Sequence, residues 1–209
     1  MSTENQESPW RRIWKALKLP STRYALGTVL VAGAIFGVMG WGAFNWALEL
    51  TNTESFCITC HEMEENTYSE YTTTVHNTNK SGVRATCPDC HVPKEWVYKV
   101  RRKIQASNEL FHHFLGTVGT PEKFEAKRLV LATHVWQTMK ETDSRECRNC
   151  HHFDSMDISR QNERARSRHL DAVQDKKTCI DCHKGVAHQL PKGTFEAEAE
   201  LNKSMSGAK

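Results

Sequence analysis

Four copies of the pattern Cys-x-x-Cys-His constrain this chain more than any other feature of its sequence. They begin at Cys57, Cys87, Cys147 and Cys179, and together they use all 8 cysteines. Two thiols at this spacing can form thioethers with the vinyl groups of one haem, and the histidine that follows then reaches the iron. A zinc site or a thioredoxin-like redox pair also uses Cys-x-x-Cys, but neither requires the adjacent histidine. The motifs therefore predict four covalently attached haem c groups.

The motifs define the first set of candidate residues. The predicted attachment residues are Cys57, Cys60, Cys87, Cys90, Cys147, Cys150, Cys179 and Cys182, and the predicted axial ligands within the motifs are His61, His91, His151 and His183. Four haems in 209 residues leave little room for a protein-only core. We therefore expect a mainly α fold with much irregular structure, in which the macrocycles are the buried apolar mass. The net charge of +3 gives no reason to propose nucleic acid as a partner.

Residues 24–48 carry no charged side chain and are long enough to cross a hydrocarbon core of about 30 Å. The apolar run ends without a small-x-small cleavage site, which favours an uncleaved transmembrane anchor over a signal peptide. Glu49 and Glu54 follow the run, whereas basic residues precede it: Arg11, Arg12, Lys15, Lys18 and Arg23. This asymmetry predicts a cytoplasmic N-terminus and a periplasmic haem domain, anchored in the bacterial cytoplasmic (inner) membrane.

The boundaries that follow are a cytoplasmic segment 1–23, the anchor 24–48, a periplasmic tetrahaem domain 49–191 and a disordered tail 192–209. In the first segment, four apolar residues have the spacing of a short amphipathic helix on the inner leaflet: Trp10, Ile13, Trp14 and Leu17. In the anchor, Gly33 and Gly37 have the spacing that lets two helices pack closely, so a homodimer through the anchor is one expectation.

The motifs fall into two pairs, which predicts two di-haem repeats. The lead-ins ATCPDCH and KTCIDCH match, and each pair has a lone histidine between its motifs. Apolar residues at spacings of three and four predict helices over 94–115 and 121–141. A third, polar helix is expected over residues 158–174. Strands are hardly indicated.

An electron-transfer haem is usually closed on both faces by histidine or methionine. His76 and His169 occupy equivalent places in the two repeats, and His188 lies in a loop that can fold back over a haem, so these three are the predicted distal ligands. His152 follows a motif histidine directly, which makes ligation by it improbable. Three others are assigned to the surface or to contacts with haem propionates: His112, His113 and His134.

The chain resembles the NapC/NirT family of membrane-anchored tetrahaem quinol dehydrogenases in four stretches: TNTESFCITCHEM, SGVRATCPDCHVP, ECRNCH and TCIDCHKGVAHQLP. The resemblance covers residues 10–191. It implies that menaquinol or ubiquinol is oxidised at the outer face of the cytoplasmic membrane. Electrons would then pass through the haems to a periplasmic reductase of the nitrate or nitrite respiratory type. It also implies distal ligands at His76, His169 and His188.

Two further positions come from the resemblance. Met63 matches a family methionine that can replace His61 on the first iron, although packing against the porphyrin edge is equally open. Lys94 departs from the histidine that many members have, and it resembles the quinol-site pattern of other branches. Glu62, with Glu64 and Glu65, offers further polar groups beside the first motif, either for quinol or as a solvated acidic patch.

Two other functions compete with quinol oxidation. A terminal reductase would act on a small substrate such as nitrite at an open haem, but no variant motif such as Cys-x-x-Cys-Lys marks one haem for that role. A passive haem shuttle would not need the transmembrane anchor. In the favoured interpretation the protein does little bond chemistry and the fold sets the order and potentials of the haems.

Overall fold

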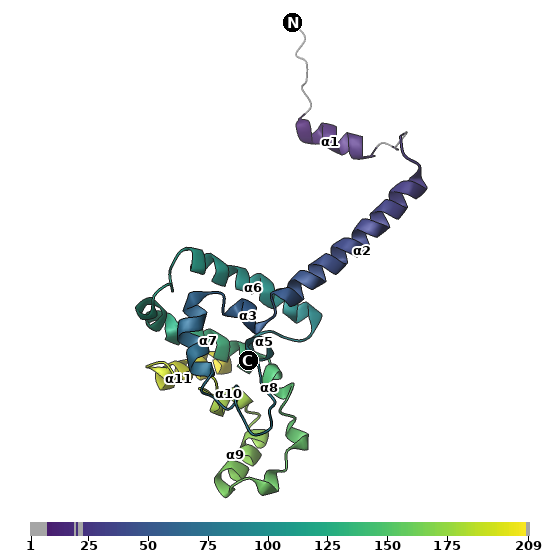
Figure 1. Ribbon diagram of the computed structural model, residues 1–209. Helices are drawn as coiled ribbons and strands as arrows, with labels where there is room; N and C mark the ends of the chain where they lie inside the picture. The colour runs from purple at the N-terminus through teal and green to yellow at the C-terminus, as the bar shows by residue number, and fades with distance from the viewer. Residues whose placement is uncertain (1–7, 19, 21–22, 208–209) are drawn as a thin grey trace. The chain divides into compact units, whose positions relative to one another are not determined.

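The structure is a computed structural model that describes residues 8–18, 20 and 23–207 (Figure 1). The side chains of residues 16–18 are not described. Residues 1–7 of the expected cytoplasmic segment and 208–209 of the expected tail therefore lie outside the described part. The chain divides into two compact units, Met1–Ala47 and Leu48–Lys209. We describe each unit by itself.

The first unit contains α1 (Pro9–Lys18) and most of α2 (Leu26–Leu50). Pro9 suits the first helical position because its missing N–H has no partner there in any helix. Trp10, Ile13 and Trp14 are exposed on α1, in agreement with a helix that needs an apolar partner surface.

Helix α2 has 25 residues, and at about 1.5 Å per residue it exceeds a hydrocarbon core of about 30 Å. Most of its apolar side chains are exposed, Phe36 by 73% and Val38 by 74%, whereas Leu48 near its end is buried. Within the described residues it is the one helix that is long and apolar enough to cross a membrane. The expected span of 24–48 is thus a helix displaced by two residues toward the C-terminus.

The second unit is helical throughout its regular structure, and the described residues contain no strand. Its elements before the two long helices are α3 (Glu54–Cys57), η1 (Met63–Tyr68), α4 (Ser69–Tyr71) and α5 (Cys87–His91). The long helices are α6 (Trp96–Phe114) and α7 (Pro121–Glu141). They are followed by α8 (Arg145–Arg148), η2 (Phe153–Ser155), η3 (Ile158–Arg160), α9 (Glu163–Gln174), α10 (Cys179–Cys182) and α11 (Thr194–Gly207). The mainly α prediction is confirmed.

The helices predicted from apolar periodicity are confirmed as α6, α7 and α9. Helix α7 begins where the sequence indicates, because the Thr120 side chain accepts a hydrogen bond from the Lys123 N–H at 3.4 Å and Pro121 occupies the first turn. Helix α9 starts later than expected, at Glu163. The Asn162 side chain caps it by accepting from Ala165 N–H at 2.9 Å.

The protein-only core of this unit is small. It consists of Trp136, Ile180 and Leu201, with four partly buried neighbours: Leu129, Ala132, Met139 and Met205. Many large apolar side chains of α6 are exposed, Phe114 by 78%. They provide apolar surface of the kind that a porphyrin covers, as the sequence led us to expect.

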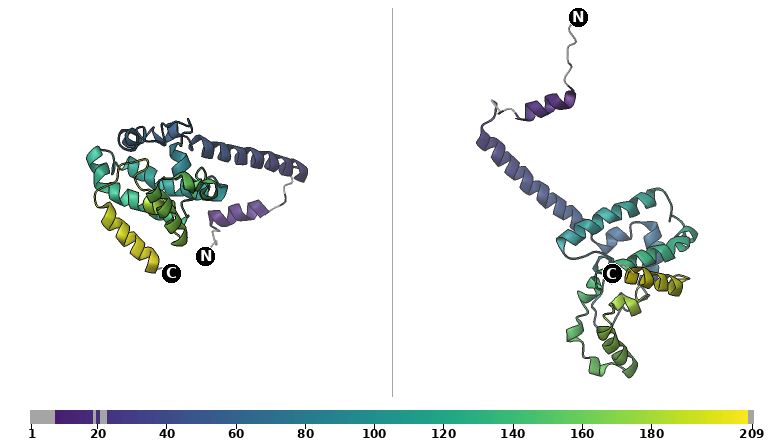
Figure 2. Two further views of the ribbon diagram at one scale, coloured as in Figure 1. Left: turned by 90° about the horizontal axis from the view of Figure 1, so that it is seen from below. Right: turned by 180° about the vertical axis from the view of Figure 1, so that it is seen from behind.

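The expectation of a disordered tail over 192–209 is wrong for residues 194–207, which form α11. This helix packs against α7, and Figures 1 and 2 show it in yellow beside the green and teal helices. Leu201 is buried between Trp136 and Ile180, and Lys184 pairs with Glu198 at 2.7 Å. The polar composition concealed a narrow apolar face, because Ala197, Leu201 and Met205 recur every fourth residue.

Candidate functional site

Two of the four motifs have both cysteines within a short helix, α5 or α10, whereas the other two have only the first cysteine in a helix, α3 or α8. Cysteines three apart on a helical turn share a face, and the histidine that follows lies beside them. In α5, Thr86 N–H and Oγ1 donate to Asp89 Oδ2 at 2.8 and 2.6 Å. In α10, Thr178 makes the same pair of bonds to Asp181 at 2.7 and 2.9 Å. The matching lead-ins are therefore matching capping boxes, each of which fixes a motif at its first cysteine.

The motif segments adjoin one another in chain order. Helix α3 packs on α5, and α5 packs on α8. The link from α8 to α10 is Ser144, which is fully buried and accepts a hydrogen bond from Ile180 N–H at 3.1 Å. The four attachment motifs thus form one continuous row, with no motif set apart from the others.

The pKa values of two cysteine thiols also indicate that successive motifs lie close together. Burial, and next the charge of Cys147, raise the pKa of the Cys90 thiol to about 11. Burial, and next the charge of Cys179, raise the pKa of Cys147. In the haem-attached form that the motifs predict, these sulfurs are thioethers, which carry no proton. The shifts therefore matter here as a sign that successive motifs lie close together.

Each motif histidine lies beside a second histidine from elsewhere in the chain. The ring centroids are separated by 6.2 Å for His61 and His113, 6.2 Å for His91 and His188, 6.3 Å for His151 and His76, and 6.0 Å for His183 and His169. Two imidazoles on opposite sides of one metal, each with its nitrogen at about 2 Å, have ring centres about 6 Å apart. The four pairs therefore fit four irons with two histidine ligands each.

Three of the four second histidines also have the hydrogen bond that an iron ligand needs. A ligating imidazole usually donates its other N–H to an oxygen, which fixes its orientation and tautomer. Nδ1 of His113 lies 2.5 Å from Glu62 Oε1, Nδ1 of His169 lies 2.6 Å from Gln161 Oε1, and Nδ1 of His76 lies 3.4 Å from the Val186 carbonyl oxygen. In each ring this leaves the Nε2 lone pair for a metal. The residues present therefore fit haem iron.

His91 and His188 form the most buried pair. Burial, then His188 and Arg102, lowers the pKa of His91 to about 4, and burial also lowers the pKa of His188. Both rings are therefore neutral near pH 7, and the neutral imidazole is the form that binds iron. Nδ1 of His188 is buried and has no hydrogen-bond partner within the described residues.

The loop that carries His188 is held by a buried ion pair. The Glu70 carboxylate accepts from Gln189 N–H at 2.8 Å and from Arg128 Nη1 at 2.9 Å. Arg128 is buried and also binds Glu125. Gly185 has φ +76°, a conformation that a side chain disfavours, and a Cβ there would meet Leu190 Cγ at 3.0 Å. The loop is thus fixed at its turn and at the residue after His188.

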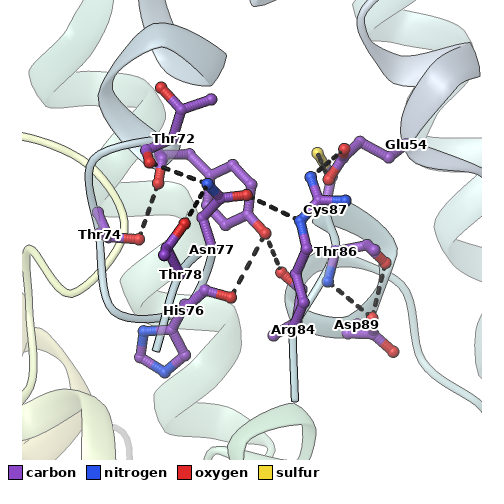
Figure 3. Close-up of polar contacts among 12 residues, drawn as sticks. Glu54, Thr72, Thr74, His76, Asn77, Thr78, Arg84, Thr86, Cys87 and Asp89 are labelled. Carbon is purple, nitrogen blue, oxygen red and sulfur yellow. Dashed lines mark hydrogen bonds and ion pairs between the residues drawn. The ribbon is translucent and has the colours of Figure 1, made fainter. Parts of the chain in front are cut away.

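The loop that carries His76 is tied to the second motif, as Figure 3 shows. The His76 carbonyl oxygen accepts a hydrogen bond from Ala85 N–H at 3.0 Å, and Arg84 Nε donates to Asn77 Oδ1 at 2.8 Å. Arg84 also pairs with Glu54, whose other oxygen lies 4.0 Å from Cys87 Sγ. His76 and Cys87, both predicted from the sequence as haem-binding residues, are therefore connected through one polar network.

The pairing interleaves the two halves of the sequence. His76, which lies between the first two motifs, meets the third motif, and His188, which follows the fourth motif, meets the second. Of the three histidines predicted as distal ligands, only His169 lies beside a motif of its own half, at His183. The duplication is thus retained in the capping boxes, whereas the equivalent histidines His76 and His169 take non-equivalent partners.

His113 is the position that sequence reasoning missed. It was assigned to the surface or to propionates, yet it pairs with His61. Apolar spacing gives no signal for it, because the partly buried face of α6 that leads to His113 consists of Lys99, Lys103 and Ala106. Within the described residues, no ring contact joins the remaining histidines outside the motifs to a motif histidine: His112, His134 and His152.

The residues predicted for quinol contact occupy different environments. Glu62 is buried beside His61 and His113, and its Oε2 makes no hydrogen bond within the described residues but lies 3.4 Å from His61 Nε2. Burial raises the pKa of Glu62, but its backbone N–H and His113 outweigh this, so the pKa is lowered and the carboxylate is charged. Met63 is 39% exposed on η1, where Thr67 Oγ1 lies 3.8 Å from its sulfur. Lys94 is exposed on the turn between α5 and α6.

Comparison with known proteins gives consistent matches along most of the chain. Residues 19–193 match the family described as "NapC/NirT cytochrome c family, N-terminal region". "Denitrification system component NirT" of Stutzerimonas stutzeri is 55% identical over 184 residues, which are 88% of this chain and 92% of that protein.

Two further relatives come from Escherichia coli (strain K12). "Cytochrome c-type protein NapC" is 54% identical over 87% of this chain and 90% of that protein. "Cytochrome c-type protein TorC" is 43% identical over 87% of this chain but only 46% of its own length. No solved structure matches the chain.

Proposed function

Because the chain belongs to the NapC/NirT cytochrome c family, we propose that it is a membrane-anchored tetrahaem cytochrome c that oxidises quinol and passes the electrons to a periplasmic reductase. The observation that carries the proposal is the set of four motif histidines, each 6.0–6.3 Å from a second histidine ring. An iron closed on both faces suits electron transfer, whereas a terminal reductase needs an open face for its substrate.

Haem supplies one-electron chemistry at iron, and the chain supplies attachment and axial ligands. We assign attachment to all eight cysteines. The distal positions are assigned to His76 opposite His151, His169 opposite His183 and His188 opposite His91. Because the motif segments adjoin one another, neighbouring haems would lie close together, as electron transfer from haem to haem requires.

The quinol site is proposed beside the first motif. Oxidation of a quinol, whether menaquinol or ubiquinol, releases two protons with two electrons, so the site needs a group that accepts a hydrogen bond from a hydroxyl. Glu62 is buried and charged, and its Oε2, which lies 3.4 Å from His61 Nε2, makes no hydrogen bond within the described residues. Lys94 would bind the quinol oxygen from the exposed turn after α5. Met63 remains the alternative to His61 as an axial ligand.

Two assignments concern the assembled protein in its membrane. The basic residues before α2 favour a cytoplasmic N-terminus and a periplasmic haem unit. A Cβ at Gly33 or Gly37 would meet nothing within 4 Å, so a second anchor could pack closely there and form a homodimer. The partner is proposed to be a reductase of nitrate or nitrite respiration, because the relatives include a denitrification component.

The test uses the purified full-length protein with its haems, incorporated in lipid nanodiscs. Menaquinol and ubiquinol analogues are added separately, and haem reduction is followed by absorbance. We expect at least one quinol to reduce the haems within seconds, while the reduced protein is not reoxidised by nitrite alone. Failure of both quinols to reduce dithionite-competent protein would exclude quinol oxidation. Rapid reoxidation by nitrite would instead favour the terminal reductase.

A further inference from the structure

His113 and Glu62 form a pair that the proposed function leaves without an assigned role at the iron. Glu62 Oε1 lies 2.5 Å from His113 Nδ1, and the Glu62 side chain is 5% exposed. An ordinary surface histidine would not meet a buried carboxylate at this distance, because desolvating a carboxylate is costly unless it is firmly paired.

The geometry of this pair matches that of the other three. His113 and His61 have ring centroids 6.2 Å apart, within the range of 6.0–6.3 Å found for the pairs of the other motifs. With the proton of His113 on Nδ1 and donated to Glu62, Nε2 keeps its lone pair. His113 also comes from the last turn of α6, where Gly116 N–H bonds its carbonyl oxygen at 2.9 Å and limits movement of the backbone.

We propose that His113 is the sixth ligand of the first haem iron and that Glu62 is the positioning residue that holds its ring. This inference rests on the haem attachment proposed above, but not on quinol as the substrate. With His61 and His113 on the iron, no position is left for Met63 as the alternative to His61, and the Met63 sulfur lies 3.8 Å from Thr67 Oγ1 on a residue that is 39% exposed. An anionic partner on Nδ1 makes an imidazole a stronger donor to iron, so Glu62 also lowers the potential of that haem.

The test is spectroscopic and uses the purified holoprotein. In His113→Ala, low-temperature electron paramagnetic resonance should show one of the four haems converted from low to high spin, with covalent haem content unchanged. Added imidazole should restore the low-spin signal, which a structural defect would not allow. His112→Ala is the matched control, because His112 is adjacent on α6 but its ring hydrogen-bonds Thr117 Oγ1 and contacts the Phe111 ring, not a motif histidine, among the described residues.

Glu62 and Met63 provide the second measurements. Glu62→Gln keeps the length and an acceptor oxygen but removes the charge, so all four haems should stay low spin while one midpoint potential rises. Met63→Leu should leave the near-infrared magnetic circular dichroism unchanged. If His113→Ala loses haem during maturation, Met63→Leu decides: an unchanged spectrum with four bis-histidine irons supports His113.

The proposal is overturned if His113→Ala leaves all four haems low spin, or if a methionine–iron band is present and disappears in Met63→Leu. Quinol-driven reduction is recorded on the same samples. A protein that shows the predicted ligand changes but is not reduced by quinol would contradict the proposed function alone. A protein that quinol reduces, but whose spectrum is insensitive to His113, would contradict the ligand assignment alone.

Discussion

A distal histidine can be removed without releasing its haem, because the thioethers to the motif cysteines remain. We expect His76→Ala, His169→Ala and His188→Ala each to convert one low-spin haem to high spin at unchanged covalent haem content. The measurement is electron paramagnetic resonance together with haem staining of denatured gels. His134→Ala is the control, since His134 is exposed on α7. A change in His134→Ala as large as in the other three would refute this set of ligands.

Lys94 is exposed on the turn between α5 and α6, so its amine can approach a quinol. Lys94→Gln keeps the length and the hydrogen-bonding capacity but removes the charge. We expect quinol-driven haem reduction to slow by about tenfold or more, the size expected for the loss of one charge-assisted contact. Dithionite should still reduce all four haems.

The control for Lys94 is Lys192→Gln, at an exposed lysine ahead of α11. It should leave the quinol kinetics unchanged. A spin-state change in Lys94→Gln would make Lys94 an iron ligand instead. Unchanged kinetics and an unchanged spectrum would remove the reason for placing quinol at this turn.

At the scale of elements, α7 is joined to the loop of His188 through Arg128 and Glu70. Arg128→Gln should destabilise the haem unit by about 3–5 kcal/mol, because it leaves a largely buried carboxylate without its cation. The measurement is the guanidinium midpoint followed by circular dichroism. Arg148→Gln is the matched control: its partner Asp143 is 66% exposed, so the cost should stay below about 1 kcal/mol. Equal midpoints for the two variants would contradict this role for Arg128.

Helix α11 is expected to stabilise the fold through one buried side chain. Leu201→Ala should cost about 2–5 kcal/mol, since it opens a cavity against Trp136 and Ile180. Phe195→Ala, on the same helix but 79% exposed, should change the midpoint by less than about 0.5 kcal/mol. If both variants have the same denaturant midpoint as the parent protein, α11 does not pack against the core in solution.

At the scale of the whole molecule, the orientation in the membrane can be tested with protease. Added to intact spheroplasts, protease should digest the haem-staining domain and leave the segment before α2 protected. The physical reason is the cluster of basic residues before the anchor, which stays on the cytoplasmic side. If protease instead cuts the first residues and leaves the haem domain intact, the assigned orientation is reversed.

The sequence was a good guide wherever the information is local. A covalent haem site needs only two cysteines and a histidine within five residues, and a membrane helix needs only length and apolarity. Helices α6 and α7 follow from apolar spacing, and α7 also from Thr120 and Pro121 at its start. It was a poor guide at α11, where most residues are polar. The few apolar side chains there stabilise a helix only because they pack against the core, which the local sequence does not show.

By itself, then, the sequence determined the four Cys-x-x-Cys-His motifs and the apolar helix α2, and it predicted three of the four histidines that lie beside motif histidines. Only the tertiary structure decided which histidine meets which motif: His76 lies beside His151 and His188 beside His91, across the two halves, while His113 lies beside His61. The physical reason is that a ligand pair joins two residues far apart in the chain. No local periodicity encodes that pairing, which the packing of α3, α5, α8 and the connecting loops brings about.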